Sequence, residues 1–247
     1  MPTQQELDLL AEDWKAYDAL FAAWLEKNPD GDFSKFTHLR VRNGLAKGAV
    51  HQTLGPNLKD GEWWQQGIPA FQTICSLIDI AKTAKVCEFG CGSARVGVHF
   101  INRQAAGCYF GVDILSDFYK YGIEIMGSLV QTKKPKFDVL PEGLEQAIAW
   151  GADLVYTTAV SLHVHPDYEA AHYATLRSLA AKPGAIVIVQ AYVTDTVTRI
   201  ARSGWARPTA HYQAMMAPFQ MIAAVDDGSW NSLGIDVGVQ MLVFSHP

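Results

Sequence analysis

Apolar residues recur with two different periods along this chain, and the periods predict its elements. Near the N-terminus apolar side chains lie three and four positions apart from Leu7 to Trp24, which predicts one amphipathic helix that ends before Asn28. A second helical run covers Phe71 to Ile80. We expect the first helix to pack on the main body of the protein, and its apolar face is also the surface through which a homodimer would form.

From Lys85 onward, short apolar runs alternate with helical patterns. Helices are predicted at residues 95–103, 116–127, 144–150 and 167–180, and strands at residues 86–89, 108–112, 137–140, 153–158, 186–193, 219–225 and 235–244. The Asp-Asp-Gly sequence at 226–228 predicts a turn between the last two strands. Strands that alternate with helices in this way predict a mainly parallel, doubly wound α/β sheet.

Composition narrows the class of protein. The chain has 247 residues, of which 49% are hydrophobic and 18% charged, which suits one globular domain with an appendage. No apolar run is long enough to span a bilayer, and Met1–Glu6 lacks the features of a signal peptide. The net charge of −5 argues against a general nucleic-acid binder. We therefore expect a cytoplasmic protein without a membrane or nucleic-acid partner.

The four cysteines lie in apolar contexts and predict buried, reduced thiols, which fits the same cytoplasmic location. Cys87 and Cys91 have neither a second cysteine pair nor a nearby histidine to complete a metal site. We expect no bound metal.

A glycine-rich turn follows the first strand of the alternation. Residues 87–95 read Cys-Glu-Phe-Gly-Cys-Gly-Ser-Ala-Arg, so the acid Glu88 precedes Gly90 and Gly92. Glycine lets the backbone turn sharply and approach a ligand, and the helix after the turn offers free amide groups at its start. The sequence therefore predicts a nucleotide-type cofactor site at the edge of the sheet.

Charge decides between the two cofactor classes that such a turn serves. The dinucleotide fingerprint requires a third glycine, at a position where this chain has Arg95. Asp113 lies about 20 residues further on and suits a ribose in either class. Glu88 would repel a pyrophosphate but would suit the sulfonium and amino groups of S-adenosylmethionine. This cofactor is favoured over NAD, and a dehydrogenase is the remote alternative.

Four segments resemble the motifs of class I S-adenosylmethionine-dependent methyltransferases. Residues 87–95 resemble motif I, 107–114 the second motif, 153–164 the fourth strand with its loop, and 179–190 the lead into the fifth strand. Their order and spacing agree over residues 63–190, and the chain departs from the pattern at Ala94, where a third glycine is usual. The resemblance implies a Rossmann-like seven-stranded sheet, mostly parallel with the last strand antiparallel. It also implies a helical N-terminal cap over residues 1–68, part of a lid, and a cofactor-binding domain over residues 69–247.

The resemblance also implies roles for individual residues. Glu88 would bind the amino group of the methionine portion, Asp113 would hold the ribose hydroxyls, and Ile114 would cover the adenine. Glu142 is the nearest candidate for the adenine amine. The remaining implied cofactor contacts are Gln66, Gly67, Gly90, Gly92, Arg95, Thr158 and Ala159.

Two acid-free stretches, Phe33–Lys59 and Thr196–Val225, stand out in an acidic protein. We interpret them as walls of one pocket for an anionic group, with a solvated basic surface as the alternative. The candidate substrate residues are His38, Arg40, Arg42, Arg207 and His211.

Methyl transfer from a sulfonium is an in-line displacement that depends on alignment and on exclusion of water, and a hydroxyl acceptor also needs a base. His163 and His165 follow the fourth strand and are the catalytic candidates. The alternative is that these histidines are structural, and His38, His51 and His211 are rivals for the role. The carboxylates near these loops are too few for a catechol-type metal site.

These observations leave two classes of function. The first is a methyltransferase that modifies O or N of a small acceptor, such as a sugar, a nucleotide-sugar or a secondary metabolite, and the acceptor is anionic if the acid-free stretches line its pocket. The second is a non-catalytic protein that keeps the cofactor-binding fold. A nucleic-acid methyltransferase is disfavoured, because the loop at 157–160 lacks the Asn/Asp-Pro-Pro-aromatic run of base-modifying relatives.

Overall fold

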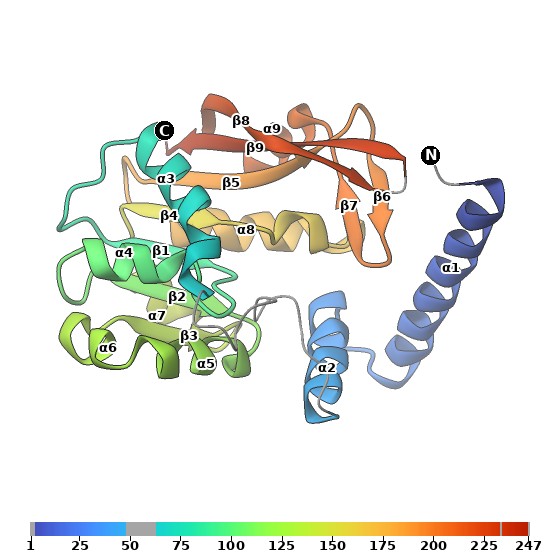
Figure 1. Ribbon diagram of the computed structural model, residues 1–247, viewed down its shortest axis with the longest axis horizontal. Coiled ribbons are helices and arrows are strands. Elements are labelled where there is room, and N and C mark those ends of the chain that lie inside the picture. The colour runs from blue at the N-terminus through green and yellow to red at the C-terminus, as the bar shows by residue number, and fades with distance from the viewer. Residues whose placement is uncertain (1–2, 48–62, 233, 247) are drawn as a thin grey trace.

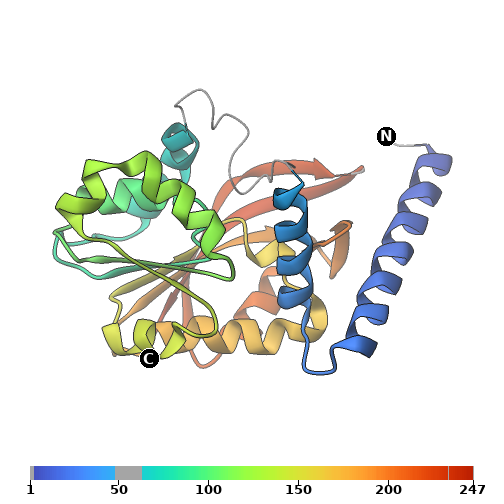
Figure 2. The same ribbon diagram turned by 90° about the horizontal axis from the view of Figure 1, so that it is seen from below.

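A seven-stranded sheet with helices on both faces forms the body of the protein (Figures 1 and 2). The computed structural model describes residues 3–47, 63–232 and 234–246. The strand order is β3-β2-β1-β4-β5-β9-β8, and β9 is antiparallel to both of its neighbours whereas the first five strands are parallel. The strands are β1 (Val86–Phe89), β2 (Tyr109–Asp113), β3 (Lys136–Val139), β4 (Leu154–Thr157), β5 (Ile186–Val193), β8 (Gln220–Ser232) and β9 (Ile235–Ser245). The predicted fold class is confirmed.

Each face of the sheet has its own apolar core. Ile74 and Phe100 belong to the core on one face, and Tyr173 and Met216 to the core on the other. All four residues of β1 are buried because helices cover both faces of this central strand. One face carries α3 (Ile68–Leu77), α4 (Gly97–Arg103), α5 (Ser116–Met126) and α6 (Ser128–Lys133), and the other carries α7 (Leu144–Trp150), α8 (Glu169–Leu179) and α9 (Thr209–Met216) (Figure 2).

The turn predicted at residues 226–228 is wrong. Strand β8 continues through these residues to Ser232, and its register against β9 shifts between Asp226 and Gly228. Gly228 has a φ of 122°, a conformation that glycine adopts at little cost. The turn-forming residues therefore produce a bulge inside a strand rather than a reversal of the chain.

Helix α2 (Phe33–Ala46), the hairpin of β6 (Thr198–Ala201) and β7 (Gly204–Ala206), and helix α9 lie in the acid-free stretches and were not predicted as elements. Helix α2 begins after Asp32, whose carboxylate accepts a hydrogen bond of 2.7 Å from the Lys35 amide. The hairpin lies beyond β5. All three segments were interpreted by their basic charge, and none was assigned a helix or a strand.

Helix α1 (Gln4–Lys27) packs against α2 and the hairpin, as expected for a cap on the main body (Figure 1). An aromatic cluster joins the three elements, and two ion pairs, Arg199–Asp18 and Arg202–Asp13, fasten the hairpin to α1. The cluster consists of Tyr17, Phe21, Phe33, Phe36 and Trp205. The domain boundary at residue 68 and the homodimer stay predictions. Among the described residues, no helix has the length and apolar character needed to cross a membrane.

Candidate cofactor and acceptor site

The glycine turn lies between β1 and α4 in a tightly fixed conformation. Gly90 and Gly92 have φ values of 76° and 52°, in the left-handed region that favours glycine. Ala94, at the place of the usual third glycine, adopts a φ of 58° as well, so the backbone keeps the turn although the residue differs. A side chain at Gly90 would meet Val160 at 2.4 Å, which shows how closely the loop after β4 approaches the turn.

The Glu88 side chain lies in the core beneath α4 and is 2% exposed. Its carboxylate accepts a hydrogen bond from the Tyr109 hydroxyl, and the Tyr156 hydroxyl also faces it without meeting hydrogen-bond geometry. Gly97 makes this arrangement possible, because an added Cβ would lie 2.1 Å from the Tyr109 hydroxyl. Burial raises the pKa of Glu88 to about 8, although both tyrosines favour the charged form.

The second acid, Asp113, closes the turn from the end of β2. Its two carboxylate oxygens accept hydrogen bonds from the Gly92 amide at 2.6 Å and from the Ile114 amide at 2.7 Å. Burial raises the pKa of Asp113 to about 6, and these amide bonds oppose the shift. The carboxylate keeps lone-pair capacity for a ligand hydroxyl beyond these amide bonds.

Gln66 and Gly67 lie on the glycine turn itself. The Arg95 guanidinium donates to the side-chain oxygen of Gln66 at 2.8 Å, and a Cβ at Gly67 would meet the backbone carbonyl of Arg95 at 1.9 Å. In the same short 3-10 helix, η3 (Trp63–Gly67), the Trp63 indole donates to the Ser93 hydroxyl at 2.8 Å. These contacts hold η3 against the turn. The hydrogen bond between Gln66 and Arg95 occupies polar atoms of both side chains.

The loop after β4 holds Thr158, Ala159 and the predicted base. The Ala159 amide donates to the side chain of Gln190 at 2.9 Å, and Ala159 has a φ of 55°. The His163 ring donates from Nδ1 to the Ser203 carbonyl at 2.9 Å, because a carbonyl only accepts. Neutral His163 therefore carries its proton on Nδ1 and has a free lone pair on Nε2.

His165 lies in a different environment from His163. Its ring is packed 4.9 Å from the Phe33 ring and 5.1 Å from the Trp205 ring, centroid to centroid, within the aromatic cluster of the cap. Its Nδ1 lies 3.7 Å from the Asp167 carboxylate. Burial lowers the pKa of His165. The arrangement is that of a packing residue between the cap and the loop.

Three further candidates form no hydrogen bond or ion pair with the glycine turn in the described parts of the chain. Arg207 is 0% exposed and forms an ion pair with Glu169, whose other oxygen lies 2.5 Å from His211 Nε2. Arg207 also donates to the carbonyls of Ser161 and Val164, so it holds the loop that carries His163. Glu142 is exposed in the connection after β3. The structure thus does not bring Arg207 or His211 together with the first basic stretch.

A cavity of about 700 Å³ lies between α1, α2 and the hairpin. Arg40 lines this cavity, whereas His38 and Arg42 do not. Arg202 and Ser203 line the opposite side, so the two acid-free stretches meet there through Arg40 and Arg202. Sequence reasoning missed Tyr109 and Gln190, because Tyr109 contacts Glu88 on the neighbouring strand, Gln190 contacts Ala159 in the loop after β4, and no local pattern marks either contact.

Within the parts of the chain that the structure describes, no three metal-binding side chains cluster. The four cysteines are free, and burial raises the pKa of the Cys87 and Cys91 thiols. These two side chains flank the buried acids as packing residues.

Comparison with known proteins identifies the fold. No protein-family model matches the sequence, and no curated protein matches it. Many solved structures do match. One is magnesium protoporphyrin IX methyltransferase (ChlM) from Synechocystis PCC 6803 with bound S-adenosylmethionine, which is 14% identical with a TM-score of 0.55 over 81% of this chain and 86% of that chain. A methyltransferase from Anabaena variabilis that depends on the same cofactor is 14% identical, with a TM-score of 0.54 over 79% and 93%.

A third solved structure shows the limit of such similarity. The [4+2]-cyclase SpnF is 10% identical with a TM-score of 0.59, over 72% of this chain and 80% of that chain. The chain therefore has the fold of class I S-adenosylmethionine-dependent methyltransferases, as the four sequence motifs predict, and a neighbour with this fold is named for a different reaction.

Because the carboxyl of Glu88 is buried, we expect the protein to lose stability as the pH rises. Its pKa is 4.5 ordinarily and about 8 in the folded protein, so the folded state binds more protons between these values. The free energy of unfolding of the unliganded protein should then fall as pH rises through this window, by up to about 1.4 kcal/mol per pH unit from this group. The Glu88→Gln variant should show a flatter profile in urea titrations between about pH 5 and pH 8.5.

The control for this prediction is Glu124→Gln, which changes an exposed acid on α5 and should keep the wild-type slope. Equal slopes for wild type and Glu88→Gln would show that Glu88 is ionised in the folded protein.

Proposed function

We propose that this protein is a methyltransferase that transfers a methyl group from S-adenosylmethionine to O or N of a small molecule. The observation that carries the proposal is the pair of buried acids, Glu88 and Asp113, on either side of the glycine turn. A ligand with sulfonium and ammonium groups favours the ionised form of a buried carboxyl, whereas a phosphate ligand disfavours it. The solved neighbour ChlM, which binds this cofactor, supports the choice.

The residues present fit the cofactor. The positive φ values of Gly90 and Gly92 give the sharp turn that such a site requires. Asp113 retains lone pairs for ribose hydroxyls after its two amide contacts. The carboxyl of Glu88 gains its charge most readily when a cation lies nearby.

When bound, the cofactor supplies an electrophilic methyl group on a positively charged sulfur. The contributions of the chain are to bind and orient the reactants, to exclude water and to accept a proton. The acceptor oxygen or nitrogen would bond to the methyl carbon, and the electron pair of the carbon–sulfur bond would stay on sulfur. The acceptor then loses its own proton, for which we assign His163 as the base.

The geometry of His163 supports this assignment. Nε2 has no hydrogen-bond partner in the described part of the chain and keeps its lone pair, since Nδ1 donates to Ser203. Val160, three residues earlier, contacts the glycine turn at Gly90, so the loop lies beside the proposed cofactor. Although His163 is exposed, surrounding protein lowers its pKa by desolvating the charged form, and the bond to Ser203 opposes this shift.

Calorimetric titration tests the cofactor. We expect S-adenosylhomocysteine to bind and NAD not to bind. Asp113→Ala should weaken S-adenosylhomocysteine binding at least about tenfold through loss of the charged hydrogen-bond acceptor. Asp117→Ala, an exposed acid in the first turn of α5, is the matched control and should bind as wild type does. Binding of NAD alone would overturn the cofactor assignment, and unchanged affinity in Asp113→Ala would remove Asp113 from the site.

A pH profile of methyl transfer tests the base. Because the pKa of His163 is lowered, kcat should rise to a plateau with an apparent pKa below the ordinary 6.5. His163→Asn keeps a donor for the Ser203 carbonyl but has no base, so it should lower kcat about 100-fold or more and abolish this limb of the profile. His165→Asn is the comparison, and an equal loss of the limb there would assign the base to His165 instead.

A further inference from the structure

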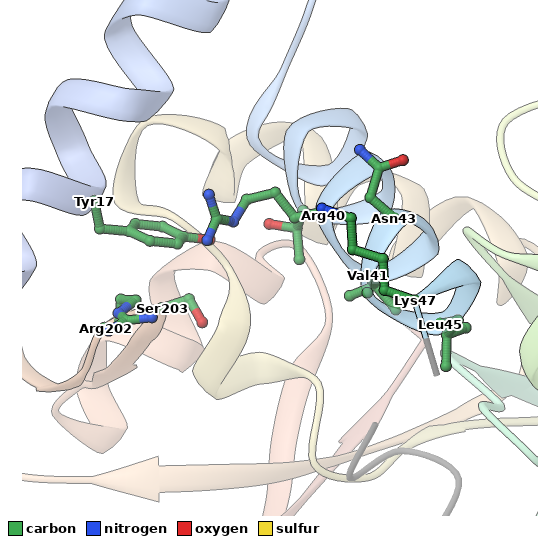
Figure 3. Close-up of a pocket in the computed structure, with 10 residues that line it drawn as sticks. Tyr17, Arg40, Val41, Asn43, Leu45, Lys47, Arg202 and Ser203 are labelled. Carbon is green, nitrogen blue, oxygen red and sulfur yellow. The ribbon is translucent and has the colours of Figure 1, made fainter. Parts of the chain in front are cut away.

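The cap contains a cavity whose charged lining residues are all basic (Figure 3). Its volume of about 700 Å³ is within the range of small-molecule sites. Helix α2 supplies one wall and the side chains of Tyr17 and Arg202 the other, and Figure 3 shows the Tyr17 ring and the Arg40 side chain pointing toward each other. Val41 and Leu45 add apolar surface.

The positive charges of this cavity are of two kinds. Arg202 is already paired with Asp13, whose carboxylate accepts two hydrogen bonds from the guanidinium. Arg40 and Lys47 form no ion pair with any acid in the described parts of the chain, and both are exposed. The cavity therefore has two cationic side chains available to a ligand.

Tyr17 holds the guanidinium groups in place. The Cζ atoms of Arg40 and Arg202 lie 5.2 Å and 6.0 Å from the centroid of its ring. A guanidinium that stacks on an aromatic face keeps its N–H groups free at its edge, where a carboxylate or phosphate oxygen binds. Tyr17 is 7% exposed, and the surrounding protein therefore holds its ring in a fixed position.

Thr37 provides a second and independent indication of a ligand. Its hydroxyl oxygen is buried and has no hydrogen-bond partner among the residues described, although Thr37 lines the cavity. Thr37, Arg40 and Val41 are three and four positions apart and share one face of α2. A buried hydroxyl without a partner is costly unless a ligand or water satisfies it.

The cavity is connected to the proposed base. Ser203, which lines the cavity, accepts the hydrogen bond from His163, and the loop of His163 contacts the glycine turn through Val160. A molecule in the cavity would therefore lie beside the loop that carries the base.

We propose that this cavity binds the acceptor, and that the acceptor is a small molecule with an apolar body and one anionic group, a carboxylate or a phosphate. Arg40 and Lys47 bind the anionic group, the Thr37 hydroxyl turns from its buried position to donate to it, and Val41 and Leu45 contact the apolar body. The identification of this ligand as the acceptor rests on the proposed function; the anion site itself does not.

Three naphthalene probes test the site in the protein without cofactor. Calorimetric titrations with 1-naphthoate, 1-naphthyl phosphate and neutral 1-naphthol should show that at least one anion binds about tenfold or more tightly than the neutral probe. The two anions distinguish a carboxylate site from a phosphate site. Arg40→Gln should remove most of this preference, and Thr37→Val should weaken anion binding several-fold without loss of thermal stability.

Arg42→Gln is the matched control, because Arg42 is an exposed arginine on the same helix but does not line the cavity. It should leave anion binding unchanged at fixed ionic strength. Equal effects of Arg40→Gln and Arg42→Gln would overturn the proposal in favour of diffuse surface charge. Equal affinity for 1-naphthol and both anions would overturn it as well.

The test separates this proposal from the proposed function. Binding of S-adenosylhomocysteine with no preference for the anions would overturn the anion site and leave the methyltransferase proposal in place. Preference for an anion with no binding of S-adenosylhomocysteine would support the anion site and overturn the cofactor. Thermal unfolding of each variant confirms that it is folded.

Discussion

The burial of the Glu88 carboxyl between β1 and α4 is the constraint on which the site depends. Its contact with the Tyr109 hydroxyl requires that α4 begin with a residue that has no side chain, and Gly97 meets this need. The turn between Glu88 and Gly97 must then reverse within a few residues, which it does through three positive φ values at Gly90, Gly92 and Ala94. The same turn is held from outside by Asp113 and by η3. A costly buried acid thus organises the backbone around it.

The cap depends on a different interaction. The aromatic cluster and the ion pairs Arg199–Asp18 and Arg202–Asp13 join α1 to the hairpin that follows β5. Because these acids neutralise the hairpin arginines, the cations of the cavity left unpaired in the described part of the chain are Arg40 on α2 and Lys47 directly after it. The cofactor and acceptor are assigned to separate parts of the chain, and His163 lies between them through its contact with Ser203.

Local sequence predicted the sheet well because each strand and each helix carries its own periodicity. Glu88, Gly90 and Asp113 could be found for the same reason, since they lie at the ends of predicted strands. The pairing of Arg207 with Glu169 could not, because it joins residues 38 positions apart in the chain. The absence of acids from a stretch of sequence likewise does not show whether acids from other parts of the chain pair with it. Asp18, for example, pairs with Arg199, which lies 181 positions away in the sequence. The charged residues at strand ends could therefore be predicted from the sequence, whereas the residues with which charged side chains form ion pairs could not.

The central claim, that a buried and protonated Glu88 is ionised by a cationic cofactor, has a direct measurement. Calorimetric titration of S-adenosylmethionine into the protein at about pH 7, in buffers of different ionisation enthalpy, counts the protons exchanged on binding. With the pKa of Glu88 at about 8 in the free protein, wild type should release up to about one proton more than Glu88→Gln. Equal proton counts for the two proteins would contradict the claim, because Glu88 would then keep the same charge with and without the cofactor.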